Sequence, residues 1–501
     1  MSIKKLAGQT AVYGLSSIIG RLLYFFLTPL YTRVFDKSDY GVMTDLFAFI
    51  GILFIFYTYR METAYFRYAS DHESVRNKTF DTAILSVGVP AMLWSVLIFL
   101  GADSIAEWFR YPEYAYIIQL CAGILFLDAL AELPLSRLRL EGKAMRFASV
   151  KLISIAVNIA LNLFFLLLCP YWLGDDAVAK GWGWLYNPEI GIGYIFIANL
   201  FASLLTVVLL SPMWLKLKFD FDKVLMVRMF RYALPLIIVG FSFVINEMFD
   251  RKIMIWLLSG TEEENKSVLG SYGAAYKLTM ILALFTQAFR YGAEPFFFQK
   301  KNAENAKELY ADVTKYYFIF GLIGCLFTLL FLDLFKYILD ESYWMALGVI
   351  PVLLLANLLN GLYYNVSIWY RLTDKTMTGA WIGLTGAAIT IALNIWWLPI
   401  FGYWGAAIAT LICYGAMLII CYLMGQKHYK VPYDLKIIGM YFLIGCLIYG
   451  LSVYLHQWLQ LNLVLTLLIN AVLFGVFVLF VLRQESALMG LVKKMRFNSR
   501  F

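Results

Sequence analysis

Residues 139–145 read Arg-Leu-Glu-Gly-Lys-Ala-Met, and residues 371–377 read Arg-Leu-Thr-Asp-Lys-Thr-Met. The same spacing carries residues 159–162, Ile-Ala-Leu-Asn, onto the identical residues 391–394. One spacing that holds over separate stretches indicates a duplicated unit, because chance apolar matches would drift out of register. In membrane chains, internal repeats of this kind build secondary transporters whose working site lies between the halves.

The composition is that of a membrane protein. Hydrophobic residues make up 62% of the chain and charged residues 15%, against about 45–50% and about 25% in soluble proteins. A helix needs about 20 mostly apolar residues to span a bilayer, and the chain offers about fourteen such stretches. We therefore expect an all-α integral membrane protein with about 14 transmembrane helices and short linkers.

Lysine and arginine residues fall mainly in alternate linkers between these stretches. If the N-terminus lies inside, the linkers after even-numbered spans are basic, and the opposite linkers are acidic, as at Glu262, Glu263 and Glu264. An excess of Lys and Arg marks the cytoplasmic side of a membrane. We expect both termini in the cytoplasm. The net charge of +8 then reflects topology and does not point to nucleic acid.

The repeat predicts two lobes of six helices each. Because six spans separate corresponding helices, the two lobes should be parallel repeats around a central cavity. We expect the N-terminal lobe at residues 1–217 and the C-terminal lobe at residues 218–428. An additional helix pair should occupy residues 429–484, followed by a basic cytoplasmic tail at residues 485–501.

Charged residues occur within spans one, two, seven and eight. A charge deep in the bilayer is costly, so it usually faces protein or water. Helices that line one polar cavity would give this distribution. The basic residues outnumber the nearby acids, which leaves room for an anionic ligand, and Arg and Lys are the usual phosphate partners. The candidate substrate-binding residues are Arg21, Arg251, Lys277 and Lys252.

Three structural interpretations compete with this binding site. Glu247 and Arg251 stand four residues apart and could pair on one helix. Asp45 and Lys277 could form a structural clasp between the lobes. Arg21 could donate to backbone carbonyls at a helix break.

Four intramembrane carboxylates are candidates for charge pairing or for coupling to a proton or sodium ion. No cofactor is expected beyond a H⁺ gradient, a Na⁺ gradient or the membrane potential as the energy source. The sequence lacks a Walker loop, a GxGxxG and an HExxH motif, so we expect neither an enzyme nor a metal site. The coupling candidates are Asp45, Glu247, Asp250 and Asp128.

Several short stretches carry a family resemblance. Arg21, the Asp-Tyr-Gly of residues 39–41 and the Phe-Arg-Tyr of residues 66–68 resemble the opening of bacterial polysaccharide flippases of the Wzx type. Asp250-Arg251 and the Gly-Ser-Tyr-Gly-Ala-Ala-Tyr-Lys of residues 270–277 resemble the seventh and eighth spans of that family. The family belongs to the MOP superfamily, together with lipid II flippases and MATE multidrug exporters.

The resemblance implies a function. The chain would move an undecaprenyl-pyrophosphate-linked oligosaccharide from the cytoplasmic to the outer leaflet of the bacterial inner membrane by alternating access. The product would serve cell-surface polysaccharide, such as O-antigen in lipopolysaccharide or capsule. Polysaccharide polymerase and assembly proteins would be its protein partners. The pyrophosphate would suit the basic residues named above.

Other classes remain open at this point. A MATE-like, cation-coupled exporter of small molecules would need a cavity led by carboxylates, whereas the intramembrane balance here is basic. A major-facilitator carrier also has parallel six-span halves, but its characteristic basic loop is missing between Phe66 and Lys78. A membrane glycosyltransferase would need a large catalytic outer loop, and the outer linkers are mostly short.

Overall fold

The computed structural model describes residues 14–485, apart from positions 17, 70–72, 175–176, 300–302, 374 and 460–461. Every regular element in this part of the chain is a helix. The class predicted from composition, an all-α membrane protein, is therefore confirmed. The predicted tail at residues 485–501 lies outside the described residues except for Glu485.

The structure consists of α-helices, labelled α, and of short 3₁₀ or π elements, labelled η. In chain order the elements are α2 (Thr28–Val34), α3 (Lys37–Thr58), α4 (Met61–Tyr68), α5 (Glu73–Leu100), α6 (Ala102–Trp108), η1 (Pro112–Tyr114), α7 (Ala115–Leu140), α8 (Ala144–Leu163), η2 (Phe164–Leu168), α9 (Cys169–Leu173), η3 (Pro188–Ile190), α10 (Gly193–Leu209), α11 (Ser211–Trp214), α12 (Lys223–Leu257), α13 (Glu262–Leu278), α14 (Met280–Gln299), α15 (Ala306–Leu330), α16 (Leu332–Phe335), η4 (Lys336–Ile338), η5 (Glu341–Val349), α17 (Ile350–Val366), α18 (Ile368–Leu372), α19 (Thr376–Phe401), α20 (Tyr403–His428), α21 (Leu435–Leu459) and α22 (Leu463–Gln484).

Twelve helices in the described chain are long and apolar enough to cross a membrane. A thirteenth span results if α13 and α14, which meet at a 46° bend, count as one. The remaining predicted span falls on α10, which has only 17 residues. The expected count of about fourteen therefore stays a prediction, as does the internal repeat.

The ends of the helices follow from local chemistry. Asp36 caps α3, because its side chain accepts a hydrogen bond from the backbone N–H of Asp39. The same span breaks at Tyr59 and Arg60, both in left-handed backbone conformation. Helix α7 ends with Arg137 and Arg139 in its last turn, where cations interact favourably with the helix dipole. Gly142, at φ +68°, then turns the chain into α8.

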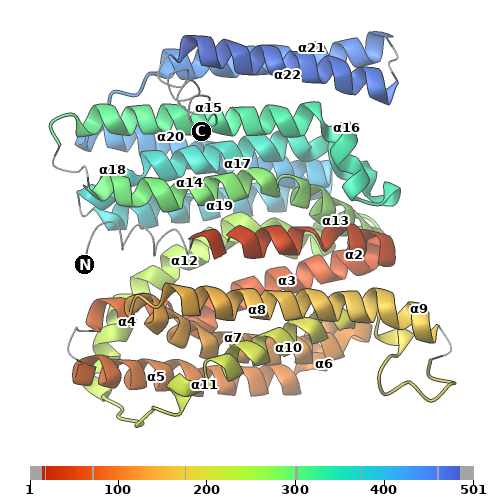
Figure 1. Ribbon diagram of the computed structural model, residues 1–501, viewed down its shortest axis with the longest axis vertical. Helices are drawn as coiled ribbons and strands as arrows, with labels where there is room; N and C mark the ends of the chain where they lie inside the picture. Colours follow the sequence, from red (N-terminus) through yellow and green to blue (C-terminus); the bar gives the residue numbers. More distant parts are fainter. Residues whose placement is uncertain are drawn as a thin grey trace, which may run out of the picture. The chain divides into compact units, whose positions relative to one another are not determined.

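The chain forms two compact units. The first consists of Met1–Lys277 and Thr376–Cys413. Within it, α7 packs against α5, α8 and α10, and α12 packs against α3 and α19 (Figure 1). Large apolar side chains on the lipid-facing parts of these helices are exposed, including Met92, Leu97 and Leu100 on α5, as expected of helices surrounded by hydrocarbon.

The second unit consists of Leu278–Lys375 and Tyr414–Phe501. Here α15 packs against α14, α17, α21 and α22. Asn470 on α22 donates from Nδ2 to the Leu330 carbonyl at 2.7 Å, and Lys315 on α15 pairs with Glu485 at 3.0 Å. These contacts hold the predicted additional helix pair on α15. The lobe boundaries at residues 217 and 428 stay predictions.

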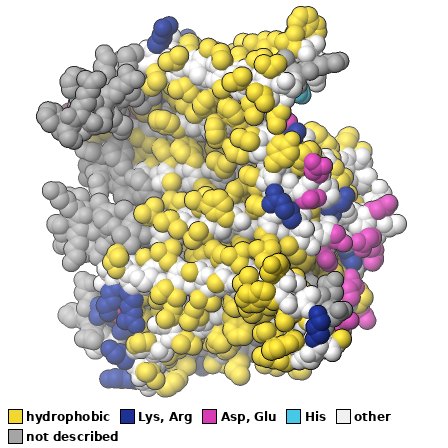
Figure 2. Space-filling model, turned by 45° about the vertical axis from the view of Figure 1, so that its right-hand side comes forward, with side chains coloured by type: hydrophobic (Ala, Val, Ile, Leu, Met, Phe, Trp, Pro, Cys, Tyr) yellow, Lys and Arg dark blue, Asp and Glu magenta, His cyan; other side chains and the backbone are white. Residues whose placement is uncertain are grey.

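Charged side chains gather at separate places on one face of the protein. On the face drawn in Figure 2, most Asp and Glu side chains gather along the right-hand side, and a cluster of Lys and Arg lies at the lower left. Hydrophobic side chains cover much of the surface between them.

Candidate functional site

Three of the predicted substrate-binding residues come together in the first unit. Lys277 lies near the end of α13, Arg251 lies on α12, and Arg21 lies in the first span, Gly14–Val34. The charged neighbours of the Lys277 ammonium group are the guanidinium groups of Arg251 and Arg21. The Arg21 and Lys277 side chains are exposed, and Arg251 is half-buried. The Lys277 ammonium group therefore lies within the electrostatic range of both guanidinium groups. We call them the cationic cluster.

Arg251 is the half-buried member of the cationic cluster. Its guanidinium carbon lies 4.0 Å from the centroid of the Tyr276 ring, a cation–π contact. Its Nε and Nη2 atoms are buried and have no hydrogen-bond partner in the described part of the chain. Buried donors without an acceptor are costly, and a guanidinium group binds phosphate oxygens in paired hydrogen bonds. The side chain is thus prepared for an anionic acceptor.

Asp250 is adjacent to Arg251 in sequence, and its oxygens are already engaged. Tyr272 donates to its Oδ2 atom at 2.8 Å, and the backbone N–H of Arg251 donates to its Oδ1 atom at 2.8 Å. Asp250 and Glu247 are the acidic groups that act on Arg251. They offset part of the charge of the cationic cluster. Sequence reasoning missed Tyr272 and Tyr276, although their spacing of four residues places both on one face of α13.

Lys252, the fourth predicted binding residue, lies in a closed ion pair. Its Nζ atom is 2.7 Å from Asp45 Oδ2, and both side chains are buried. Tyr111 donates a further hydrogen bond to the same oxygen, and the ammonium lies 3.0 Å from the centroid of the Phe109 ring. Asp45 therefore pairs with Lys252, and the alternative clasp between Asp45 and Lys277 is wrong. The sequence could not show this, because Phe109 and Tyr111 come from a linker.

The coupling candidates occupy different surroundings. Asp45 is held by Lys252, whereas Asp250 and Glu247 lie beside Arg251. Asp128 on α7 hydrogen-bonds Ser203 on α10 and has Lys151 on α8 as its charged neighbour. Asp128 therefore belongs to a separate polar cluster inside the helices of the first unit.

Two helices cross at backbone contact beside the cationic cluster. A Cβ atom added to Gly270 on α13 would lie 1.9 Å from the Lys37 carbonyl oxygen at the start of α3. A Cβ atom on Gly41 of α3 would lie 2.0 Å from the Lys266 carbonyl oxygen. Only glycine fits at such distances. The Tyr-Gly and Gly-Ser-Tyr-Gly stretches of the sequence therefore hold α3 and α13 together.

The contacts around this crossing extend to the linker between α6 and α7. Lys266 Nζ pairs with Glu113 at 3.1 Å, and Tyr114 donates to the Asp39 carboxylate. Arg110 lies 3.8 Å from Glu262. These ion pairs and the glycine crossing join α3, α13 and the α6–α7 linker at the end of α13 that carries Glu262. We call this set of contacts the acidic-end seal.

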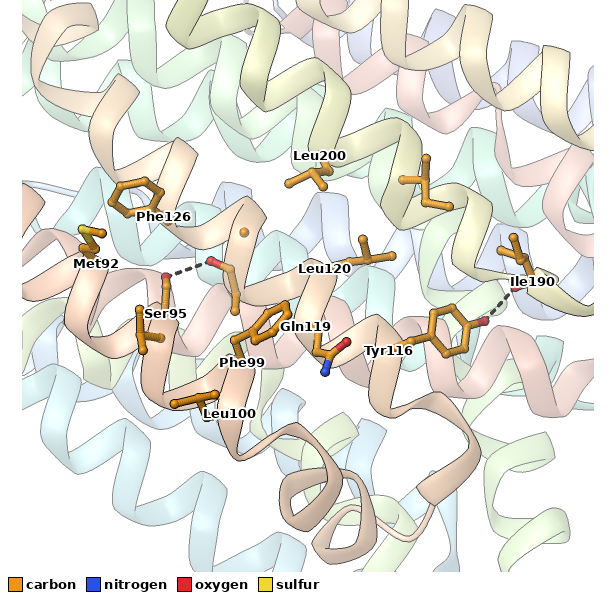
Figure 3. Close-up of a pocket in the computed structure, with 14 residues that line it drawn as sticks. Met92, Ser95, Phe99, Leu100, Tyr116, Gln119, Leu120, Phe126, Ile190 and Leu200 are labelled. Atoms are coloured by element: carbon orange, nitrogen blue, oxygen red, sulfur yellow. Dashed lines mark hydrogen bonds between the residues drawn. The ribbon is translucent and has the colours of Figure 1, made fainter. Parts of the chain in front are cut away.

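A cavity of about 590 Å³ opens elsewhere in the first unit, between α5, α7 and α10 (Figure 3). Its walls are mostly apolar. Ser95 donates to the Ala122 carbonyl at 2.9 Å and Tyr116 to the Ile190 carbonyl at 2.8 Å. Because these polar groups are already paired, the cavity suits hydrocarbon and not a pyrophosphate.

The chain resembles known proteins both in sequence and in fold. Residues 6–289 match the family described as Polysaccharide biosynthesis protein. No curated protein matches the chain by sequence. Among solved structures, the lipid II flippase MurJ in an inward closed conformation is similar at a TM-score of 0.71 and 15% identity, over 94% of this chain and 99% of MurJ.

MATE transporters share the fold as well. An inward-facing multidrug resistance MATE transporter of the MOP superfamily is similar at a TM-score of 0.64 and 15% identity, over 81% of this chain and 94% of that chain. At these identities the likeness establishes the fold. The molecule is a multi-pass membrane protein with the fold of the MOP superfamily.

Proposed function

We propose, from the premise that this chain belongs to the polysaccharide biosynthesis protein family, that it is a flippase for a lipid-linked oligosaccharide. The substrate is an undecaprenyl-pyrophosphate-linked oligosaccharide, and transport runs from the cytoplasmic to the outer leaflet of the bacterial inner membrane. The N- and C-termini lie in the cytoplasm. Polymerase and assembly proteins for cell-surface polysaccharide take over the product.

The observation that carries this proposal is the cationic cluster of Arg21, Arg251 and Lys277. A pyrophosphate brings several acceptor oxygens and at least two negative charges. It would satisfy the buried donors of Arg251 and relieve the repulsion among the three cations. An uncharged glycan headgroup would accept hydrogen bonds but would leave the charge repulsion in place.

Transport by alternating access is supported by the acidic-end seal. With the substrate's pyrophosphate at the cationic cluster, the glycan would leave only after α3 and α13 separate. The ion pairs of the seal are few and partly exposed, so their loss is a modest cost. Transport would be coupled to H⁺, Na⁺ or the membrane potential through intramembrane carboxylates. Asp250 and Glu247, which interact electrostatically with Arg251, are the first candidates. Asp45 and Asp128 are the others.

A MATE-like exporter of organic cations is the second candidate, and it is favoured by the shared fold. A cationic cluster would repel such a substrate. Cells that express the protein should therefore show unchanged resistance to cationic drugs. A rise in resistance that depends on Arg251 would favour the exporter.

The experiment that tests the proposal follows lipid-linked oligosaccharide by leaflet in cells that lack the protein. The oligosaccharide should accumulate in the cytoplasmic leaflet and return to the outer leaflet when the wild-type chain is restored. Arg251→Gln should fail to restore it. Arg231→Gln, a matched control at an exposed position on the same helix, should restore it fully. Normal leaflet distribution without the protein would contradict the proposal.

A further inference from the structure

A second basic site lies in the first unit, apart from the cationic cluster. A cavity of about 410 Å³ opens where α5 and α8 begin and α7 ends. Its polar wall carries five cations and one carboxylate. Phe147 and Met213, next to it, belong to a buried apolar cluster, so the cavity has a fixed floor. The residues that line it are Arg76, Asn77, Arg137, Glu141, Lys143, Arg146, Pro212, Met213 and Lys216.

Among the described residues that line this cavity, Glu141 carries the one carboxylate, and both of its oxygens accept hydrogen bonds. Arg137 donates from Nε to Glu141 Oε1 at 2.8 Å, and Lys143 donates to Glu141 Oε2 at 2.6 Å. Burial opposes ionisation of Glu141, but these two hydrogen bonds outweigh it and hold the pKa of its carboxyl group below the usual value. Arg137 also donates from Nη2 to Asn77 at 2.6 Å. Glu141 therefore bridges Arg137 and Lys143, and because its charge is single, the three side chains together keep a net charge of +1.

Three cations in the cavity remain without a carboxylate. Arg76, Arg146 and Lys216 form no ion pair in the described part of the chain. The Nε atom of Arg76 is buried and has no hydrogen-bond partner there. Like charges this close repel one another, and buried donors without an acceptor are costly. An anion in the cavity would reduce this repulsion and accept a hydrogen bond from Arg76 Nε.

The N-terminus of a helix at the cavity adds to the positive electrostatic potential there. Arg76 and Arg146 stand in or beside the first turns of α5 and α8, and the first turn of α8 contains no acidic residue. The N-terminus of a helix carries a partial positive charge, so a cation there is unfavourable and an anion is favourable. The N-terminus of α8 thus adds to the positive potential of the three side chains at this cavity.

We propose that this cavity binds a phosphate group. The phosphate can belong to the headgroup of an anionic membrane lipid, because the cavity opens at the ends of spanning helices and basic pockets between such helices bind lipid headgroups. It can also belong to a free phosphate or pyrophosphate. The site is separate from the cationic cluster, so it goes beyond the transported substrate.

The test measures the affinity of the purified full-length chain in detergent for dioctanoyl phosphatidylglycerol. Dioctanoylglycerol, which has the same chains without the phosphate, is the control ligand. Phosphatidylglycerol should bind tightly and dioctanoylglycerol weakly. Arg76→Gln and Arg146→Gln should each raise the dissociation constant about ten-fold, the loss expected for one charge-assisted hydrogen bond. Lys218→Gln, an exposed basic position beside the cavity, and Arg251→Gln should leave it unchanged.

Inorganic pyrophosphate, added as a competitor, distinguishes the two sources. Competition indicates that free phosphate enters the site, and its absence assigns the site to lipid. Either result supports the proposal. Equal affinity in the wild type and in the Arg76→Gln and Arg146→Gln variants overturns it, as does a loss of binding in Arg251→Gln alone. If the arginine variants do not fold, the exposed Lys216→Gln variant decides, and unchanged affinity there overturns the proposal.

Discussion

At the scale of single residues, the charges inside this molecule fall into two kinds. Lys252 and Asp45 neutralise each other within a shell of aromatic rings. Arg251 has buried donors that find no acceptor among the residues the structure describes. A closed pair of this kind is structural, because each charge already has its counter-charge in the protein. A guanidinium group with unpaired donors can bind an anionic ligand.

The closed pair can be tested by removing one charge and then both. Asp45→Leu leaves the Lys252 charge buried and unpaired, which should lower the free energy of unfolding by about 3–5 kcal/mol. The double variant Asp45→Leu with Lys252→Met should recover most of that loss, because an apolar pair of similar volume is tolerated. Thermal unfolding of the purified variants measures both effects.

The same double variant also tests the prediction that Lys252 binds substrate. If the pair is structural, a stable double variant should still transport lipid-linked oligosaccharide. Normal stability combined with a complete loss of transport would indicate that Lys252 binds the substrate.

Glu141 gives a prediction for pH. Its pKa is lower in the folded protein than in the unfolded chain, so its ionised form contributes stability above the unfolded pKa. That contribution is lost as the pH falls through the folded pKa. The unfolding temperature of Glu141→Gln should therefore be lower than that of the wild type at pH 7, and the two should converge below about pH 4. A gap that persists at low pH would contradict this assignment.

At the scale of elements, the sequence predicted the spanning helices well, because about 20 apolar residues in a row have few alternatives in a bilayer. It predicted the cationic cluster for a related reason, since Arg21, Arg251 and Lys277 are expensive in lipid unless they face a shared cavity. It could not predict which cation Asp45 would pair with. That choice depends on how closely α3 approaches α12, and on the linker residues Phe109 and Tyr111.

The crossing of α3 and α13 is the element whose disruption has the clearest consequence. In Gly270→Val, the added carbons would collide with the Lys37 carbonyl, so the two helices must separate. Overpacking of this kind costs about 1–3 kcal/mol. We expect the variant to insert normally and to be trapped with its acidic end open. A cysteine placed at position 113 should then react faster with an impermeant thiol reagent than in the wild type, and an unchanged rate would contradict the role of the crossing.

At the scale of the whole molecule, the basic and acidic linkers define an orientation. We expect the loop at Glu262–Glu264 on the outside and both termini in the cytoplasm. A cysteine at position 263 should react with an impermeant reagent in intact cells. Five of the six native cysteines are buried, and the exposed Cys446 must be replaced first. Reaction only after permeabilisation would reverse the orientation and the direction of transport.

The central claim is that Arg21, Arg251 and Lys277 together bind the pyrophosphate of a lipid-linked substrate. The most direct measurement compares the affinity of the purified protein for undecaprenyl pyrophosphate and for undecaprenyl monophosphate, in the wild type and in Arg251→Gln, Lys277→Gln and the control Arg231→Gln. The wild type and the control should prefer the pyrophosphate. Each cluster variant should lose about ten-fold in affinity for it and most of that preference. Equal affinities for both lipids in all four proteins would contradict the claim.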